Sequence, residues 1–140
     1  MSDKSTHSPE YAIVTGAGQG IGLAASRRLA EDGFRVMMVD RNAEVLTRAA
    51  DQLSLAGLNV SCHELSITDR AAVAALISGL PRLDVLVNNA AVFWDGKFEE
   101  TTEDDFKKMY EVNVIGTFVM AQEAAKIMQR GARIVNITSR

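Results

Sequence analysis

The chain alternates short apolar runs with longer amphipathic segments along almost its whole length. Runs of strand type stand at 11–14, 35–39, 58–62, 83–87 and 133–137. Between them, apolar residues recur at helical spacing. Strands that are apolar almost throughout and alternate with helices are typical of a parallel sheet covered on both faces. Because crossovers between parallel strands are right-handed, we expect an α/β, doubly wound sheet with strand order 3-2-1-4-5.

Polar residues that favour helix starts support this alternation. The candidate N-caps are Asn42, Thr68 or Asp69, and Thr102. Asp105 stands three residues after the last of these caps, at the spacing of a capping box. From there the apolar pattern predicts one long, continuous helix over about 102–130.

A glycine-rich turn joins the first strand to the first helix. The glycines stand in the pattern G-x-x-x-G-x-G, preceded by Thr15. A strand that passes through such a turn into a helix directs backbone N–H groups and the positive helix end at one point. The segment therefore predicts a binding site for the pyrophosphate of a dinucleotide, the alternative being a turn that holds no ligand. The residues expected to contribute are Gly16, Gln19, Gly20, Ile21 and Gly22.

An acidic residue, Asp40, ends the second strand about 20 residues after the glycine turn, where dinucleotide-binding folds place the acid that binds the adenosine ribose hydroxyls. Its charge would repel a 2′-phosphate, which favours NAD over NADP. Arg41 is the opposing feature, because a guanidinium there can pair with that phosphate. The structural alternative for Asp40 is a turn or capping aspartate.

Four segments together resemble the short-chain dehydrogenase/reductase family. They are the glycine turn, Asn88-Asn89-Ala90-Ala91, Val112-Asn113-Val114-Ile115-Gly116 and Ile134-Val135-Asn136-Ile137-Thr138-Ser139. The resemblance implies a single NAD(P)-binding, Rossmann-like domain over 10–140. It also implies that Asn89, Ala90 and Ala91 lie against the adenosine ribose. Since Ala91 replaces the family's glycine, this position is expected to have a negative φ.

The resemblance also suggests two catalytic residues. Asn113 matches the family's helix asparagine, where a local irregularity of the helix holds a water of the proton relay. Ser139 matches the serine whose hydroxyl binds the substrate oxygen. The structural alternatives are a satisfied core asparagine and an ordinary turn serine.

The sequence departs from the family at two places. After the third strand, Ser66 stands where the family has an aspartate that contacts the adenine amino group, so this contact is expected to be weaker, with the backbone of Ile67 still available. The family's Y-x-x-x-K motif is absent, because four positions after Tyr11 and Tyr110 stand threonine and valine. The resemblance thus implies the N-terminal, cofactor-binding half of a domain incomplete at its C-terminus, inactive without that tyrosine and lysine.

Three hypotheses for function follow, of which the third is a regulatory Rossmann protein that binds another partner. The first is an NAD(P)-dependent oxidoreductase that transfers hydride between a nicotinamide cofactor and a small secondary alcohol or ketone. The second is a non-catalytic dinucleotide-binding module or sensor. The resemblance further implies a homodimer or homotetramer, and a fifth strand without later strands should leave an exposed edge. Phe93 and Trp94 either line the substrate mouth or cover the long helix.

Composition excludes several other classes. The net charge of −3 and scattered basic residues give no reason to bind nucleic acid. No apolar run approaches the roughly 18 residues that span a bilayer, and the polar residues 1–9 are expected to be a flexible lead-in. The lone Cys62 fits a reducing cytoplasm. His7 and His63 have no partners at ligand spacing, so no metal site is expected.

Overall fold

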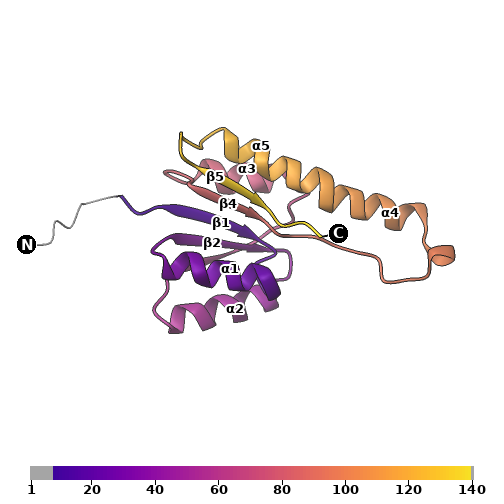
Figure 1. The fold of residues 1–140 in the computed structure, drawn as a ribbon, viewed down its shortest axis with the longest axis horizontal. Coiled ribbons are helices and arrows are strands. Elements are labelled where there is room, and N and C mark those ends of the chain that lie inside the picture. Colours follow the sequence, from indigo (N-terminus) through magenta and orange to yellow (C-terminus); the bar gives the residue numbers. More distant parts are fainter. Residues whose placement is uncertain (1–7, 140) are drawn as a thin grey trace, which may run out of the picture.

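The computed structural model, which describes residues 8–139, contains a five-stranded parallel sheet between two layers of helices (Figure 1). Strands β1 to β5 span Tyr11–Thr15, Arg35–Asp40, Val60–Glu64, Val85–Asn88 and Arg133–Asn136. Helices α1 to α5 span Gly20–Glu31, Ala43–Leu55, Arg70–Ser78, Glu103–Tyr110 and Thr117–Ala125. A 3₁₀ turn, η1, covers Phe98–Glu100, and a π-helical segment, η2, covers Glu111–Gly116.

The strand order is β3-β2-β1-β4-β5 and every neighbouring pair is parallel, as predicted. The sequence therefore folds as a Rossmann-like doubly wound sheet. In this order β2 and β3 lie on one side of β1, and β4 and β5 lie on the other. The point between β1 and β4 is therefore the topological switch point of the sheet. Ligands of open α/β sheets bind at such a switch point, outside the carboxyl ends of the strands.

Side chains along each strand alternate between the two faces of the sheet and so contribute to two separate hydrophobic cores. One face of β1, β2 and β4 packs on α1 and α2, around fully buried residues such as Val14, Met38 and Leu46. The other face packs on α3 and α5, around Ile13, Leu86 and Met120. Both faces of the central strands are thus covered, which explains why these strands read as continuous apolar runs.

Two strands begin two residues later than predicted. Leu58 donates its N–H to Leu53 at the C-terminal end of α2, so this residue belongs to the helix end and β3 starts at Val60. The fourth strand starts at Val85 because the Asp84 carboxylate, rather than a backbone carbonyl, accepts the Tyr11 N–H at 2.8 Å. At Leu58 a helix-end contact takes the place of sheet pairing, whereas the backbone of Asp84 also bonds to Tyr11 and Arg133 of the neighbouring strands.

The prediction of one continuous α-helix after Thr102 is wrong in its middle. The start is as predicted, because Thr102 and Asp105 form a complete capping box. Six residues, Glu111–Gly116, then adopt π-helical geometry between α4 and α5. Segments of this kind occur frequently at functional sites. Gly116 lies against Ile67, where a Cβ at position 116 would stand 2.7 Å from that side chain.

One side of the domain remains open. Every residue of β5 is exposed, including Ile134 and Val135, which confirms the expected uncovered edge. The outer face of the α4–α5 segment also exposes large apolar side chains, among them Phe106 and Phe118. Of the expected lead-in, Ser8 and Pro9 are exposed, and residues 1–7 lie outside the described residues. Within residues 8–139, no helix has the length and apolar character needed to cross a bilayer.

Candidate functional site

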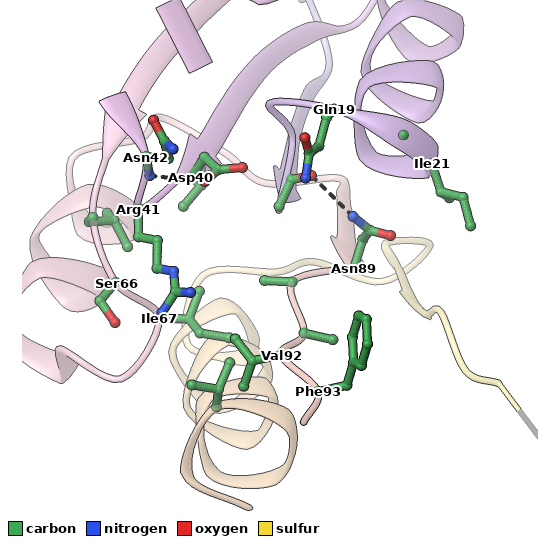
Figure 2. A pocket seen from close by; sticks show the side chains of 17 residues that line it. Gln19, Ile21, Asp40, Arg41, Asn42, Ser66, Ile67, Asn89, Val92 and Phe93 are labelled. Atoms are coloured by element: carbon green, nitrogen blue, oxygen red, sulfur yellow. Dashed lines mark hydrogen bonds between the residues drawn. The ribbon is translucent and has the colours of Figure 1, made fainter. Parts of the chain in front are cut away.

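A cavity of about 630 Å³ lies at the carboxyl ends of β1, β2 and β4, at the switch point of the sheet (Figure 2). Eleven of the twelve residues predicted to bind a cofactor line it. These are Gly16, Gln19, Gly20, Ile21, Asp40, Arg41, Ser66, Ile67, Asn89, Ala90 and Ala91. The tertiary structure therefore brings together segments that are spread over about half of the chain.

The glycine turn presents open space in front of α1. Gly20 has a φ of 55°, and a Cβ built there would meet no atom within 4 Å. Gln19, the N-cap of α1, makes no capping hydrogen bond with its side chain. The side chain of Gln19 therefore does not cap the first backbone N–H groups of the helix, which stand at the positive end of the helix dipole. This arrangement suits a pyrophosphate.

Gly22 is the predicted cofactor residue that does not line the cavity. A Cβ at this position would lie 2.1 Å from the carbonyl oxygen of Gly16. Its place is thus behind the turn, where the absence of a side chain lets α1 approach the end of β1. The residue shapes the cradle without lining it.

Thr15, which the sequence places at the start of the glycine turn, holds the turn against β4. Its hydroxyl oxygen accepts the backbone N–H groups of Asn89 and Ala90, both at 3.0 Å. The Asn89 side chain in turn donates to the carbonyl oxygen of Thr15 at 3.1 Å. It also donates to the carbonyl oxygen of Gly16 at 3.2 Å (Figure 2). These bonds join the two sides of the switch point.

Asp40 occupies the end of β2 on the wall of the cavity. Its Oδ2 accepts the backbone N–H of Gly18 at 3.1 Å. Its Oδ1 accepts the backbone N–H of Asn42 at 3.0 Å (Figure 2). Each carboxylate oxygen retains a further lone pair for a ribose hydroxyl. Asp40 can therefore stabilise the turns at Gly18 and Asn42 and still bind the ribose of a cofactor. Arg41 lines the same cavity, and no ion-pair partner lies near it within residues 8–139.

The segment that follows β3 forms the outer end of the cavity. Leu65 and Ile67 contribute apolar walls, opposite Val112 of η2. Between them, the Ser66 hydroxyl lies 2.8 Å from that of Thr68 and accepts the Thr68 N–H at 3.3 Å. Wall residues that the sequence did not indicate are Val39, Asn42, Leu65, Val92 and Val112.

The end of β4 combines sheet stabilisation with cavity lining. Asn88 is buried and donates its side-chain amide to Asn136 of β5 at 3.0 Å. Ala91 follows in the cavity wall. Within residues 8–139, no residue other than glycine has a positive φ, so the alanine fits here without backbone strain, as expected.

Asn113 lies in the π-helical segment and clamps the loop after β4. Its Oδ1 accepts the Val92 N–H at 2.8 Å, and its Nδ2 donates to the Val92 carbonyl at 2.7 Å. The expected irregularity of the helix is therefore present at this residue. Asn113 does not line the cavity itself, but it holds in place the loop that carries Val92 and Phe93, both of which do.

Ser139 lies in the exposed segment just after β5 and does not line the cavity. Its segment is tied to the site through β4, because Ile137 donates its N–H to the Asn88 carbonyl at 2.9 Å. The loop after β4, with Phe93, extends on the neighbouring side. Ser139 thus stands at the carboxyl end of the sheet, on the side opposite to β3.

Among residues 8–139, Asp40 and Arg41 are the ionisable residues that line this cavity. His63 of β3 is half-buried, with Nε2 at 2.9 Å from the Ser61 hydroxyl, and burial lowers its pKa. Within the described part of the chain, no group of three or more His, Cys, Asp or Glu side chains is arranged to hold a metal ion.

The doubly wound sheet, the glycine cradle and the acid at the end of β2 define a nucleotide-binding protein of the Rossmann type. The family model described as short chain dehydrogenase matches residues 10–140. The chain belongs to the short-chain dehydrogenase/reductase family.

Individual relatives agree with this assignment. An uncharacterized oxidoreductase of Methylorubrum extorquens is 35% identical over 138 residues, which cover 93% of this chain and 54% of the relative. Sorbitol dehydrogenase of Cereibacter sphaeroides is 33% identical over 135 residues, covering 91% and 52%. The structure of a short chain dehydrogenase from Burkholderia cenocepacia in complex with NADP is 32% identical, with a TM-score of 0.82 and coverage of 91% and 54%. The chain spans about half the length of these relatives.

Proposed function

We propose that this chain forms the cofactor-binding part of an oxidoreductase that transfers hydride between a nicotinamide dinucleotide and a secondary alcohol or ketone. The observation that carries the proposal is the single cavity in which the open glycine turn at Gly20 and the carboxylate of Asp40 meet. The oxidoreductases among the relatives support the reaction class.

Each segment of the cavity has a defined task in this proposal. The N–H groups at the start of α1 bind the pyrophosphate, and Asp40 accepts the hydroxyls of the adenosine ribose. The bound dinucleotide supplies the site that gives or takes hydride. On the β4 and β5 side, Ser139 hydrogen-bonds the substrate oxygen, and Asn113 fixes the loop that carries Phe93. Phe93 is 82% exposed at the cavity mouth and offers an apolar surface to a substrate.

For the cofactor, we favour NAD over NADP. The Asp40 carboxylate faces the cavity with its charge stabilised by two N–H donors, so a second anion at the ribose 2′ position would be repelled. Arg41 favours NADP instead, because its side chain lines the same wall and its guanidinium can pair with a 2′-phosphate. The Burkholderia relative was crystallised with NADP, so the two residues must be separated by experiment.

We also propose that the protein assembles with copies of itself. The outer face of α4, η2 and α5 exposes aromatic and aliphatic side chains in series, including Phe106, Tyr110, Val114 and Phe118. Apolar patches of this kind mark contact surfaces in soluble proteins. Sedimentation of the purified chain would give the stoichiometry.

The second candidate function is a dinucleotide-binding module without catalysis. The specific observation in its favour is that the cavity with Gly20 and Asp40 accounts for dinucleotide binding without Ser139, which does not line it. In this family, the acid or base of hydride transfer is a tyrosine whose pKa is lowered by a lysine four positions later.

Cofactor binding and turnover distinguish the proposals. Purified 140-residue chain should bind NADH in calorimetry and show no oxidation of secondary alcohols with NAD. Turnover by material of verified mass would contradict the assignment of proton transfer to a tyrosine–lysine pair. If the chain binds neither NADH nor NADPH, the proposed cofactor site is wrong.

A further inference from the structure

The sheet order predicts where each part of a bound dinucleotide lies. The glycine turn follows β1, Asp40 ends β2, and Ser66 follows β3, and these strands are neighbours in the order β3-β2-β1. With the phosphates at the turn and a ribose at Asp40, the attached base falls at the end of β3. This placement rests on the proposed function, and it brings the base next to Ser66.

The walls of the cavity near β3 could contact the two faces of the base. Ile67 is buried and, with Leu65 and Val112, forms an apolar surface. The guanidinium of Arg41 reaches across the cavity toward Ile67 (Figure 2), and planar guanidinium groups stack on aromatic rings. Such contacts do not depend on which groups the edge of the ring carries.

Two hydroxyl groups lie at this end, because Ser66 lines both cavities and Thr68 lines the second. The Ser66 and Thr68 hydroxyls are 2.8 Å apart, and either oxygen can be the donor. One of the two hydroxyl hydrogens joins the pair, and the other remains free. Lone pairs also remain, because only the Thr68 N–H and the shared hydrogen occupy them. The pair therefore offers both a donor and an acceptor to whatever group it faces.

Space also continues beyond Ser66. A second cavity of about 270 Å³ shares Arg41, Ser66 and Val112 with the first and is lined further by Thr68 and Lys108. A substituent on the edge of the base would thus meet room and adaptable hydroxyls. The carboxylates of Asp105 and Glu111 and the ammonium group of Lys108 also line this second cavity, so acceptors and a donor are both present beyond Ser66.

From this arrangement we propose that the site does not discriminate at position 6 of the purine. A dinucleotide whose base is a 6-oxopurine, hypoxanthine, binds about as well as one with adenine. The amino group of adenine finds an acceptor in the Ser66–Thr68 pair, and the carbonyl group of hypoxanthine finds a donor in the same pair. A carboxylate at position 66 would offer acceptors only and would therefore select adenine.

The test compares NADH with reduced nicotinamide hypoxanthine dinucleotide by titration calorimetry on the 140-residue chain. We expect dissociation constants within about threefold of each other, which is less than 1 kcal/mol. Ser66→Asp should favour the adenine form by about tenfold or more. Ser54→Asp, the matched control, adds the same charge on the exposed face of α2 outside both cavities and should leave the ratio near that of the unchanged chain.

Preference of the unchanged chain for adenine by about tenfold or more would overturn this inference and leave the proposed function standing. The same holds if Ser66→Asp is folded, by circular dichroism, but does not change the ratio. If neither dinucleotide binds, the proposed function fails and the inference fails with it. The unchanged chain alone decides the point if Ser66→Asp does not fold.

Discussion

Asp40 Oδ2 accepts the backbone N–H of Gly18 at 3.1 Å, so the acid at the end of β2 is bonded directly to the glycine turn. A Cβ at position 18 would lie 3.0 Å from the same oxygen, which shows how closely the two segments approach. The residue proposed to read the ribose therefore also positions the segment proposed to bind the phosphates.

This link predicts the effect of Asp40→Ala. Loss of a charged hydrogen-bond acceptor should weaken NAD binding by about tenfold or more, corresponding to roughly 1.5–3 kcal/mol. NADP should lose less, because repulsion of its 2′-phosphate is removed at the same time. Calorimetric titration with both cofactors measures the two changes, with Asp51→Ala on the exposed face of α2 as the control. If the ratio of the two affinities does not change, Asp40 does not select the cofactor.

The open space in front of Gly20 predicts that Gly20→Ala prevents NADH binding beyond its effect on the stability of the fold. Gly20→Ala places a methyl group where the pyrophosphate would lie and adds backbone strain of about 1 kcal/mol. Gly33→Ala is the matched control, because Gly33 also has a positive φ with no atom within 4 Å of a Cβ and does not line the cavity. Both variants should lower the melting temperature by similar amounts, and only Gly20→Ala should abolish NADH binding. Equal NADH affinities would place the phosphates elsewhere.

The paired hydrogen bonds between Asn113 and Val92 predict a loosened loop on substitution. Asn113→Ala should lower the free energy of unfolding by about 1–2 kcal/mol, because two backbone groups lose their partner. Asn113→Asp keeps an acceptor for the Val92 N–H but sets a carboxylate against the Val92 carbonyl, so it should recover stability at low pH. Fluorescence of Trp94, the single tryptophan, reports on this loop. Unchanged emission and stability in Asn113→Ala would show that the loop holds its position by other contacts.

The buried carboxylate of Glu123 predicts a pH dependence of stability. Lys126 and Arg70 donate to it at 2.8 and 2.9 Å, and the hydrogen bond from Lys126 and then that from Arg70 hold its pKa below the ordinary value against the effect of burial. A lowered pKa in the folded state means that the carboxylate stabilises the fold above the pKa of the unfolded chain. This stability is lost as the pH falls through the folded pKa.

Urea unfolding of Glu123→Gln measures this contribution. The difference from the unchanged chain should be large near about pH 7 and should shrink toward about pH 3. Glu44→Gln is the control, because the Glu44–Arg48 pair is exposed on α2 and should contribute little at either pH. A constant difference for Glu123→Gln over this range would mean that packing, and not charge, accounts for its effect.

Much of this architecture could be predicted because its signals are local. The apolar runs, the glycine turn, the Asn42 cap and the Thr102–Asp105 capping box each depend on residues within a few positions. The starts of β3 and β4 were misplaced for the opposite reason. They depend on Leu53 at a helix end and on Tyr11, a residue 73 positions from Asp84.

By itself the sequence determined the winding of the sheet, the place of the switch point and the set of segments that reach it. Hydrophobic period and turn chemistry are properties of short stretches, and the handedness of crossovers limits how such stretches combine. Only the tertiary structure decided that Thr15 joins the glycine turn to Asn89 and that Asn113 clamps Val92 through a π-helical segment. It also decided that the Ser66 hydroxyl is paired with Thr68 at the end of the cavity. Hydrogen bonds between distant residues depend on the relative positions of packed elements, and no local pattern records those positions.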